Sequence, residues 1–133
     1  MEGTAYRSEW WSVELPLGWI GYRGEECSTF QTQPPLGALQ ISAARKSDGP
    51  ITDGDLQEFG AARVGPETEL QESGFGAFTG FTARYRKDGL RWQEWWFRSG
   101  HLLVYVTYNV RQEDEPIEQA AISSILESLA PVA

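Results

Sequence analysis

The stretch that decides the fold is LRWQEWWFRSGHLLVYVTYNV, residues 90–110, which holds three of the chain's six tryptophans. Both of its halves are rich in aromatic and β-branched residues, and Ser99-Gly100 between them is a turn signal. The pattern predicts two antiparallel strands joined by a tight hairpin. It also raises a question of function, because Trp92, Trp95 and Trp96 could be either a recognition surface or the core of a sheet.

The predicted pairing sorts these side chains onto two faces. With Ser99-Gly100 as a two-residue loop, Phe97 pairs with Leu102 and Trp95 with Val104. Because side chains alternate along a strand, one face is wholly apolar and the other is mixed. We expect a helix near the C-terminus to cover the apolar face, and a helix over 52–64 to cover the mixed face or leave it partly open. A slip of one residue would exchange the faces of one strand. The apolar face comprises Trp95, Phe97, Leu102, Val104 and Val106, and the mixed face Trp92, Glu94, Trp96, Leu103, Tyr105 and Thr107.

Further strands flank this hairpin. The segment AFTGFTARYR is predicted to pair through the turn KDG, and three strands are expected earlier in the chain. The first of them alternates Trp11, Val13 and Leu15 with polar residues. The second, WIGYRGEECSTFQT, is weaker and interrupted by glycine, and the third is GALQISAAR.

Two helices complete the pattern. Thr52 and Asp55 form a capping signature, and Gly65-Pro66 ends the first helix. The second helix follows Pro116, with an apolar stripe of Ile117, Ala121, Ile122, Ile125, Leu126 and Leu129. The order of three strands, a helix, three strands and a helix predicts an α+β domain with an antiparallel sheet of about six strands. We expect one domain over 1–133, with 1–9 as a loose tail.

Charge and composition restrict the partners. The net charge is −8, which disfavours nucleic acid and favours a basic protein partner. Residues 76–98 carry five of the bases and only two acids, so we expect a basic strip there that binds an acidic patch, on another protein or on a second copy of this chain. No membrane-spanning run, leader or cysteine pair is evident, so a cytoplasmic location is expected.

The sequence offers little catalytic chemistry. His101 is the only histidine and Cys27 the only cysteine, so we expect no metal site, and no cofactor motif is present. Cys27 follows Glu25 and Glu26, which is not the electropositive setting of a reactive cysteine. Glu94 is the one acid flanked by aromatic residues, as in some carbohydrate or acid–base sites. Pairing of Glu94 with a nearby arginine is the competing interpretation, and we expect no enzymatic activity.

One resemblance adds to this interpretation. The motif Leu15-Pro16-Leu17-Gly18-Trp19, the LQIS strand and the order of elements over roughly residues 10–130 resemble the PsbP/Mog-like superfamily, in particular its DcrB-like and Eag-type branches. The resemblance implies an antiparallel sheet with helices on both faces, and a non-catalytic protein that binds other proteins. It implies no cofactor and no catalytic residue. The tryptophan-rich meander and the lack of an apolar groove distinguish this chain from the chaperone branch.

The sequence therefore predicts a non-catalytic cytoplasmic protein-binding domain of the bacterial toxin-immunity or effector-chaperone kind. The predicted partner is a basic toxin or effector. The alternatives are a domain that binds a small ligand or carbohydrate through its aromatic meander and, third, an unrecognised hydrolase. The candidate partner-binding residues are Trp92, Glu94, Trp96, Tyr105, Arg84, Arg86 and Arg91.

Overall fold

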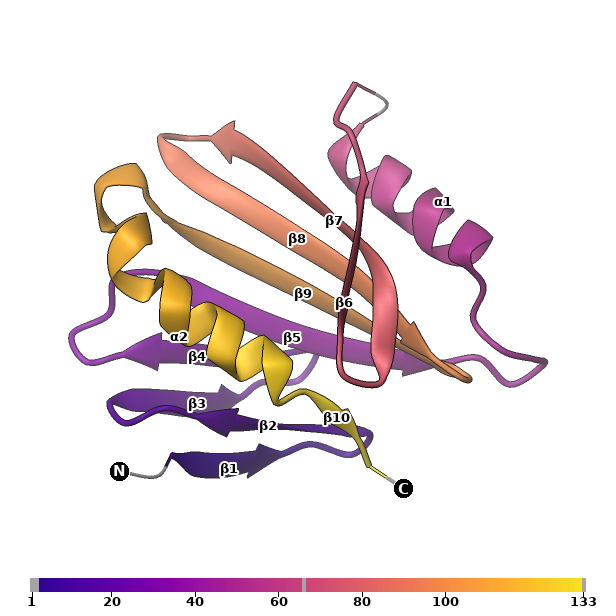
Figure 1. Ribbon diagram of the computed structural model, residues 1–133, viewed down its shortest axis with the longest axis horizontal. Helices are drawn as coiled ribbons and strands as arrows, with labels where there is room; N and C mark the ends of the chain where they lie inside the picture. The colour runs from indigo at the N-terminus through magenta and orange to yellow at the C-terminus, as the bar shows by residue number, and fades with distance from the viewer. Residues whose placement is uncertain (1–2, 66, 133) are drawn as a thin grey trace.

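A computed structural model describes residues 3–65 and 67–132 and confirms the α+β class. Figure 1 shows helix α2 lying across one side of the main sheet, with α1 near β7 and the edge strand β6. No helix in the described residues is both long and apolar enough to span a membrane. The strands are β1 (Thr4–Arg7), β2 (Trp11–Leu15), β3 (Trp19–Arg23), β4 (Ser28–Thr32), β5 (Ala38–Arg45), β6 (Gln71–Phe75), β7 (Phe78–Lys87), β8 (Leu90–Ser99), β9 (Leu102–Arg111) and β10 (Ala130–Pro131), and the helices are α1 (Asp53–Val64), the 3-10 turn η1 (Gln112–Asp114) and α2 (Glu115–Glu127).

The strands form two sheets rather than one sheet of about six. The main sheet has seven strands in the order β3-β4-β5-β9-β8-β7-β6, and a three-stranded sheet has the order β1-β2-β10. The prediction of a loose tail over 1–9 is wrong for 4–7, because these residues pair with β2. The glycine-interrupted segment predicted as one strand is two strands, since 24–27 form a turn between β3 and β4. Strand β6 lies in the connection between α1 and β7, where the sequence pattern predicts no strand, and pairs with β7.

The two faces of the meander are as predicted, although the register of the hairpin is not. Its loop is Gly100-His101, so Phe97 pairs with Val104 and Trp95 with Val106. The observed pairing partner of each residue lies two positions further along β9 than the predicted one. Because side chains alternate between the faces of a strand with a period of two residues, no side chain changes face. The apolar face packs with α2 in the larger core, and the mixed face packs with α1 in a smaller core.

Both helices follow their local signals. The hydroxyl of Thr52 accepts from the Asp55 backbone N–H at 3.1 Å, and the Asp55 carboxylate accepts from the Thr52 N–H at 3.0 Å, which completes the predicted capping box. In α2 the apolar stripe begins one turn later than predicted, because Ile117 is 66% exposed. The buried position beside it is Glu118, whose carboxylate accepts from the Tyr108 hydroxyl at 2.7 Å and the Gly37 backbone N–H at 3.2 Å.

We predict that Trp95→Ala lowers the free energy of unfolding by about 3–5 kcal/mol, the usual cost of deleting a large buried aromatic side chain. Trp95 is 4% exposed and belongs to the core beneath α2. Trp92 is only half-buried, so Trp92→Ala should cost clearly less. Chemical denaturation of both variants measures the difference, and equal large losses would contradict the assignment of Trp92 to the surface.

Candidate functional site

The candidate binding residues lie on opposite sides of the main sheet. On β8 the even-numbered residues Trp92, Glu94 and Trp96 face the α1 side, together with Tyr105 of β9. Arg91 has the opposite parity and faces the α2 side, where the antiparallel register places Arg84 and Arg86 of β7. The predicted residues therefore form two separate surfaces.

Glu94 organises the α1 side. Its side chain is fully buried and accepts hydrogen bonds from the hydroxyl groups of Tyr85 and Tyr105, the latter at 2.6 Å. Arg63 of α1 donates through Nε to the Tyr105 hydroxyl at 2.8 Å and lies 3.7 Å from the Glu94 carboxylate. A buried carboxylate needs such partners, because an unpaired charge in the interior costs several kcal/mol. Both the tyrosine and the arginine partners of Glu94 are therefore already supplied within the protein.

The tryptophans divide between core and surface. Trp96 is fully buried and packs with Leu56 of α1 and Phe81 of β7, so the prediction that Trp96 contacts a partner is wrong. Trp92 lies beyond the end of α1, is half-buried and stacks on Tyr85 with ring centroids 6.1 Å apart. With Tyr105 and Arg63 it lines a pocket of about 240 Å³.

The side chains next to Trp92 form what we call the open face, the part of the α1 side that extends from β3 to β7 beyond the apolar cluster under α1. Its members are half-buried or exposed, except for the buried Thr107. Each of these members is uncharged, and charged side chains lie at their edge: Arg63 of α1 lines the Trp92 pocket, and Lys87 and Arg111 follow Tyr85 and Asn109 on the same side of β7 and β9. The register defines it as Ile20, Tyr22, Thr29, Gln31, Ala38, Gln40, Ser42, Tyr85, Trp92, Thr107 and Asn109.

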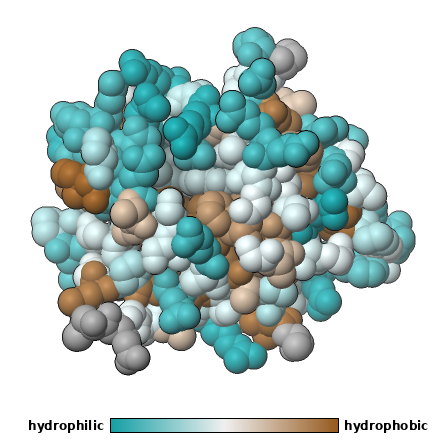
Figure 2. Space-filling view, in the orientation of Figure 1, coloured by the Kyte–Doolittle hydropathy of each residue, from teal (hydrophilic) through white to brown (hydrophobic). Residues whose placement is uncertain are grey.

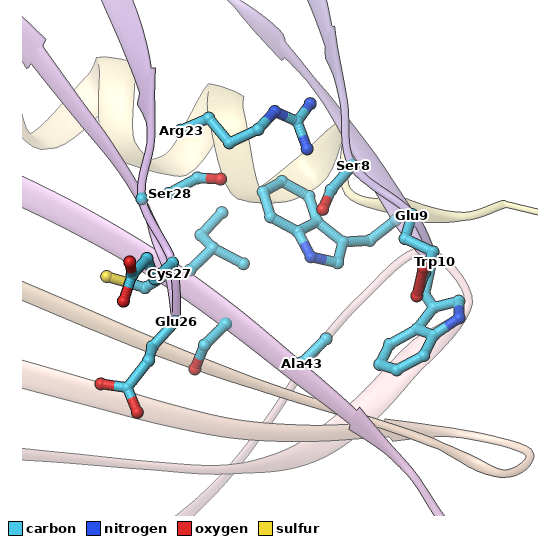
Figure 3. A pocket seen from close by; sticks show the side chains of 13 residues that line it. Ser8, Glu9, Trp10, Arg23, Glu26, Cys27, Ser28 and Ala43 are labelled. Carbon is cyan, nitrogen blue, oxygen red and sulfur yellow. The ribbon is translucent and has the colours of Figure 1, made fainter.

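An acidic pocket of about 190 Å³ adjoins the open face, and Cys27 and Ser42 line both it and the Trp92 pocket. Figure 3 shows Glu26 and Cys27 on one side of this pocket and Glu9 and Trp10 on the other, with Arg23 extending over it toward Ser8. Arg23 donates to the Arg7 backbone oxygen at 2.7 Å and is thereby held in place. The carboxylates of Glu9, Glu25 and Glu26 remain exposed and give the pocket an acidic rim.

The α2 side, on which Arg84, Arg86 and Arg91 lie, carries a groove of about 220 Å³ between α2 and strands β6 to β9. Arg86 lies directly opposite Arg91 in the sheet, and Arg84 lies opposite Gln93 two residues along. Arg91 is 3.7 Å from the Glu115 carboxylate, whereas the described residues include no ion pair with Arg84 or Arg86. The basic strip expected from the sequence is therefore present only in part: Arg84, Arg86 and Arg91 share the side of the sheet that faces away from Trp92, whereas Lys87 lies on the Trp92 side.

Neither His101 nor the acidic residues form a metal site in the described residues. His101 is exposed at the hairpin turn, and its Nδ1 lies 3.0 Å from the Lys46 backbone oxygen. The part of the chain that the structure describes contains no cluster of three or more acids, histidines or cysteines suited to a metal ion. Sequence reasoning missed Tyr85 and Arg63. Alternation along β7 could have placed Tyr85 beside Trp92, but no local pattern connects Arg63 of α1 with Glu94.

Comparison with known proteins identifies the fold. No protein-family description and no curated protein sequence matches the chain. A protein of Bacteroides thetaiotaomicron superposes with a TM-score of 0.75 at 15% identity over 100% of this chain, which spans only 50% of that protein. Cyanobacterial PsbP (CyanoP) from Synechocystis superposes with a TM-score of 0.65 at 14% identity, covering 98% of this chain and 93% of that one. LpqN, involved in cell envelope biogenesis of Mycobacterium tuberculosis, gives 0.63 at 13% identity, with 98% and 86% covered. The chain therefore has a PsbP-like fold.

The tyrosine hydroxyls around Glu94 lead to a prediction about pH. Burial and the hydrogen bond to the Glu94 carboxylate raise the pKa of Tyr85 and of Tyr105 well above the ordinary value of 10.0. As pH rises through the ordinary tyrosine pKa, the unfolded chain loses tyrosine protons that the folded protein keeps. The unfolded state then binds fewer protons than the folded state, so the free energy of unfolding falls as pH rises.

We expect this fall between about pH 9 and about pH 11 to be smaller in Tyr105→Phe than in the wild type. Urea denaturation at both pH values measures the difference. The control is Tyr22→Phe, which removes the hydroxyl of a residue that is 48% exposed and should leave the fall unchanged. Equal pH dependence in the wild type and Tyr105→Phe would contradict the role of Glu94.

Proposed function

We propose that this protein is a non-catalytic binding module that docks another protein on its open face. The observation that carries the proposal is that the members of the open face are uncharged, with the charged side chains Arg63, Lys87 and Arg111 at its edge. Charged residues are depleted in the centre of protein interfaces, while tyrosine and tryptophan are enriched there. Tyr22, Tyr85 and Trp92 provide large contact areas with few rotatable bonds, and the surrounding threonine, serine and glutamine side chains can adapt their hydrogen bonds.

The acidic rim supports a basic partner. Glu9, Glu25 and Glu26 are exposed around the pocket that adjoins the open face, and the whole chain carries a net charge of −8. Charges at the edge of an interface accelerate association with a partner of the opposite sign and disfavour partners of the same sign. A basic toxin or effector, bound as an immunity protein or a chaperone binds its partner, has the matching chemistry.

The surroundings of Glu94 support a binding role over hydrolysis. This acid is fully buried and is hydrogen-bonded to two tyrosine hydroxyls, so it does not face a pocket in which a substrate could meet it. The alternative of a carbohydrate or another drug-sized ligand at Trp92 is less favoured, because the pocket of about 240 Å³ is smaller than those that usually enclose ligands of that size. A thermal-shift screen with glycans and metabolites tests that alternative separately.

The test places a charge in the middle of the open face. Gln40 is half-buried and central, and in Gln40→Arg a bound partner would cover an unpaired guanidinium. Such burial costs several kcal/mol, so we expect binding to weaken about a hundredfold. The experiment is to co-purify the tagged protein with its partner from the native host, identify the partner by mass spectrometry, and titrate purified partner with wild type and variant.

The matched control is Gln112→Arg, which makes the same chemical change at an exposed position in η1, outside the open face. It should bind as the wild type does, and both variants should retain the wild-type unfolding midpoint to within a few degrees. Unchanged affinity of Gln40→Arg, or an equal loss in both variants, would exclude the open face as the docking surface.

A further inference from the structure

The groove on the α2 side combines an apolar floor with unpaired positive charge. Trp95 of β8 and Ile122 and Leu126 of α2 are at most 5% exposed and line it, together with Phe75 of β6. Arg84 and Gln93 stand at its rim. Figure 2, which views this side of the molecule, shows apolar surface near the centre, ringed by hydrophilic side chains.

Arg84 lines the groove, and the arginines next to it in the sheet are not placed for stability alone. Arg86 and Arg91 face each other directly across β7 and β8, and like charges in that position are destabilising. Arg91 is compensated by Glu115 at 3.7 Å. In a chain with 19 acids and 11 bases, carboxylates are plentiful, yet none of the described ones pairs with Arg84 or Arg86. These two guanidinium groups are therefore available to an external anion.

The size of the groove limits the apolar part of a ligand. A dry cavity of about 150 Å³ accepts one benzene molecule. The groove, at about 220 Å³, holds a body somewhat larger than one six-membered ring, and its aromatic walls Trp95 and Phe75 favour a ring. Arg84 then lies at the rim, where its planar guanidinium can form two parallel hydrogen bonds with a carboxylate.

We propose that this groove binds a small carboxylic acid with an apolar, preferably aromatic, body. The body lies against Phe75 and the accessible edges of Trp95 and Ile122, and the carboxylate pairs with Arg84 within the positive field of Arg86. Because the groove and the open face lie on opposite sides of the sheet, this site is independent of the protein-docking function proposed above. The charge of Glu115 at the rim is offset by Arg91, so it does not exclude the anion.

The test uses 4-phenylbutyrate as the probe and its uncharged amide as the matched ligand. Titration of the ¹⁵N-labelled protein should shift the backbone signals of Ser73, Gln93, Gln119 and Ser123, which line the groove, and leave those of Gln40 and Ser42 on the open face in place. The amide should bind at least about tenfold more weakly, because it lacks the charge-assisted hydrogen bonds.

Three variants make the result specific. Arg84→Gln should weaken 4-phenylbutyrate binding about tenfold. Lys87→Gln removes the same charge from the same hairpin but on the other side of the sheet, so it should leave the affinity unchanged. Ser123→Phe, at an exposed position that lines the groove, should fill the groove and abolish binding while the remaining spectrum stays folded.

Four outcomes would overturn the proposal. They are no binding at millimolar probe, equal binding of acid and amide, equal effects of Arg84→Gln and Lys87→Gln, and shifts outside the groove. Sedimentation at low and high salt tests whether a second copy of the chain, rather than a small acid, occupies the groove. If the protein does not bind 4-phenylbutyrate but forms a salt-sensitive dimer, and Arg84→Gln abolishes that dimer, the groove binds an acidic surface of a second copy.

Discussion

Strand β8 carries large side chains on both of its sides, and this requirement determines the layers of the molecule. Trp95 and Phe97 need cover on one side and Trp96 needs cover on the other, because each is at most 4% exposed. A sheet covered on only one face would leave either Trp96 or the pair Trp95 and Phe97 exposed to water, so a helix packs on each side. Helix α1 is only 12 residues long and covers Trp96 and its neighbours, which leaves the rest of that side to the open face.

The period of two along β8 also separates two kinds of chemistry. Neighbouring residues such as Arg91 and Trp92 belong to opposite sides, one next to an unpaired basic strip and the other on an uncharged aromatic surface. Glu94 would add a negative charge to that aromatic surface, but its carboxylate is enclosed by Tyr85, Tyr105 and Arg63. The interior hydrogen bonds of Glu94 thus keep its carboxylate away from the open face.

How far the sequence predicts this structure depends on whether the signal is local. The alternation in residues 90–110 assigned the faces correctly even though the turn was misplaced, since an error of two residues preserves the face. The capping residues of α1 could also be predicted, because their hydrogen bonds form within one helical turn. Strand β6, with the sequence QESGF, was missed because its strand conformation comes from pairing with β7 rather than from its own residues.

The candidate site was less predictable, for the same reason. Local pattern identified the tryptophans and arginines but placed them in one set, because composition does not show on which side of a sheet a residue lies. Trp96 looked like Trp92 in the sequence, and only the docking of α1 makes one of them core. Arg63 joins Glu94 through tertiary packing across 31 positions, counted from 63 to 94, and no spacing rule covers such a contact.

The small sheet has a consequence for the order in which the protein can be assembled. Strand β2 is completed by β10, in which Ala130 pairs with Ser12, and the Val132 backbone N–H donates to the Trp10 carbonyl at 2.9 Å. During synthesis β2 emerges early and has only β1 beside it, whereas β10 is made last of the described strands. Closing so long a loop is slow compared with forming the neighbouring hairpins. Until residues 130–132 have been made, one edge of β2 is therefore unpaired, and a nascent chain stalled before residue 130 exposes that edge to other strands.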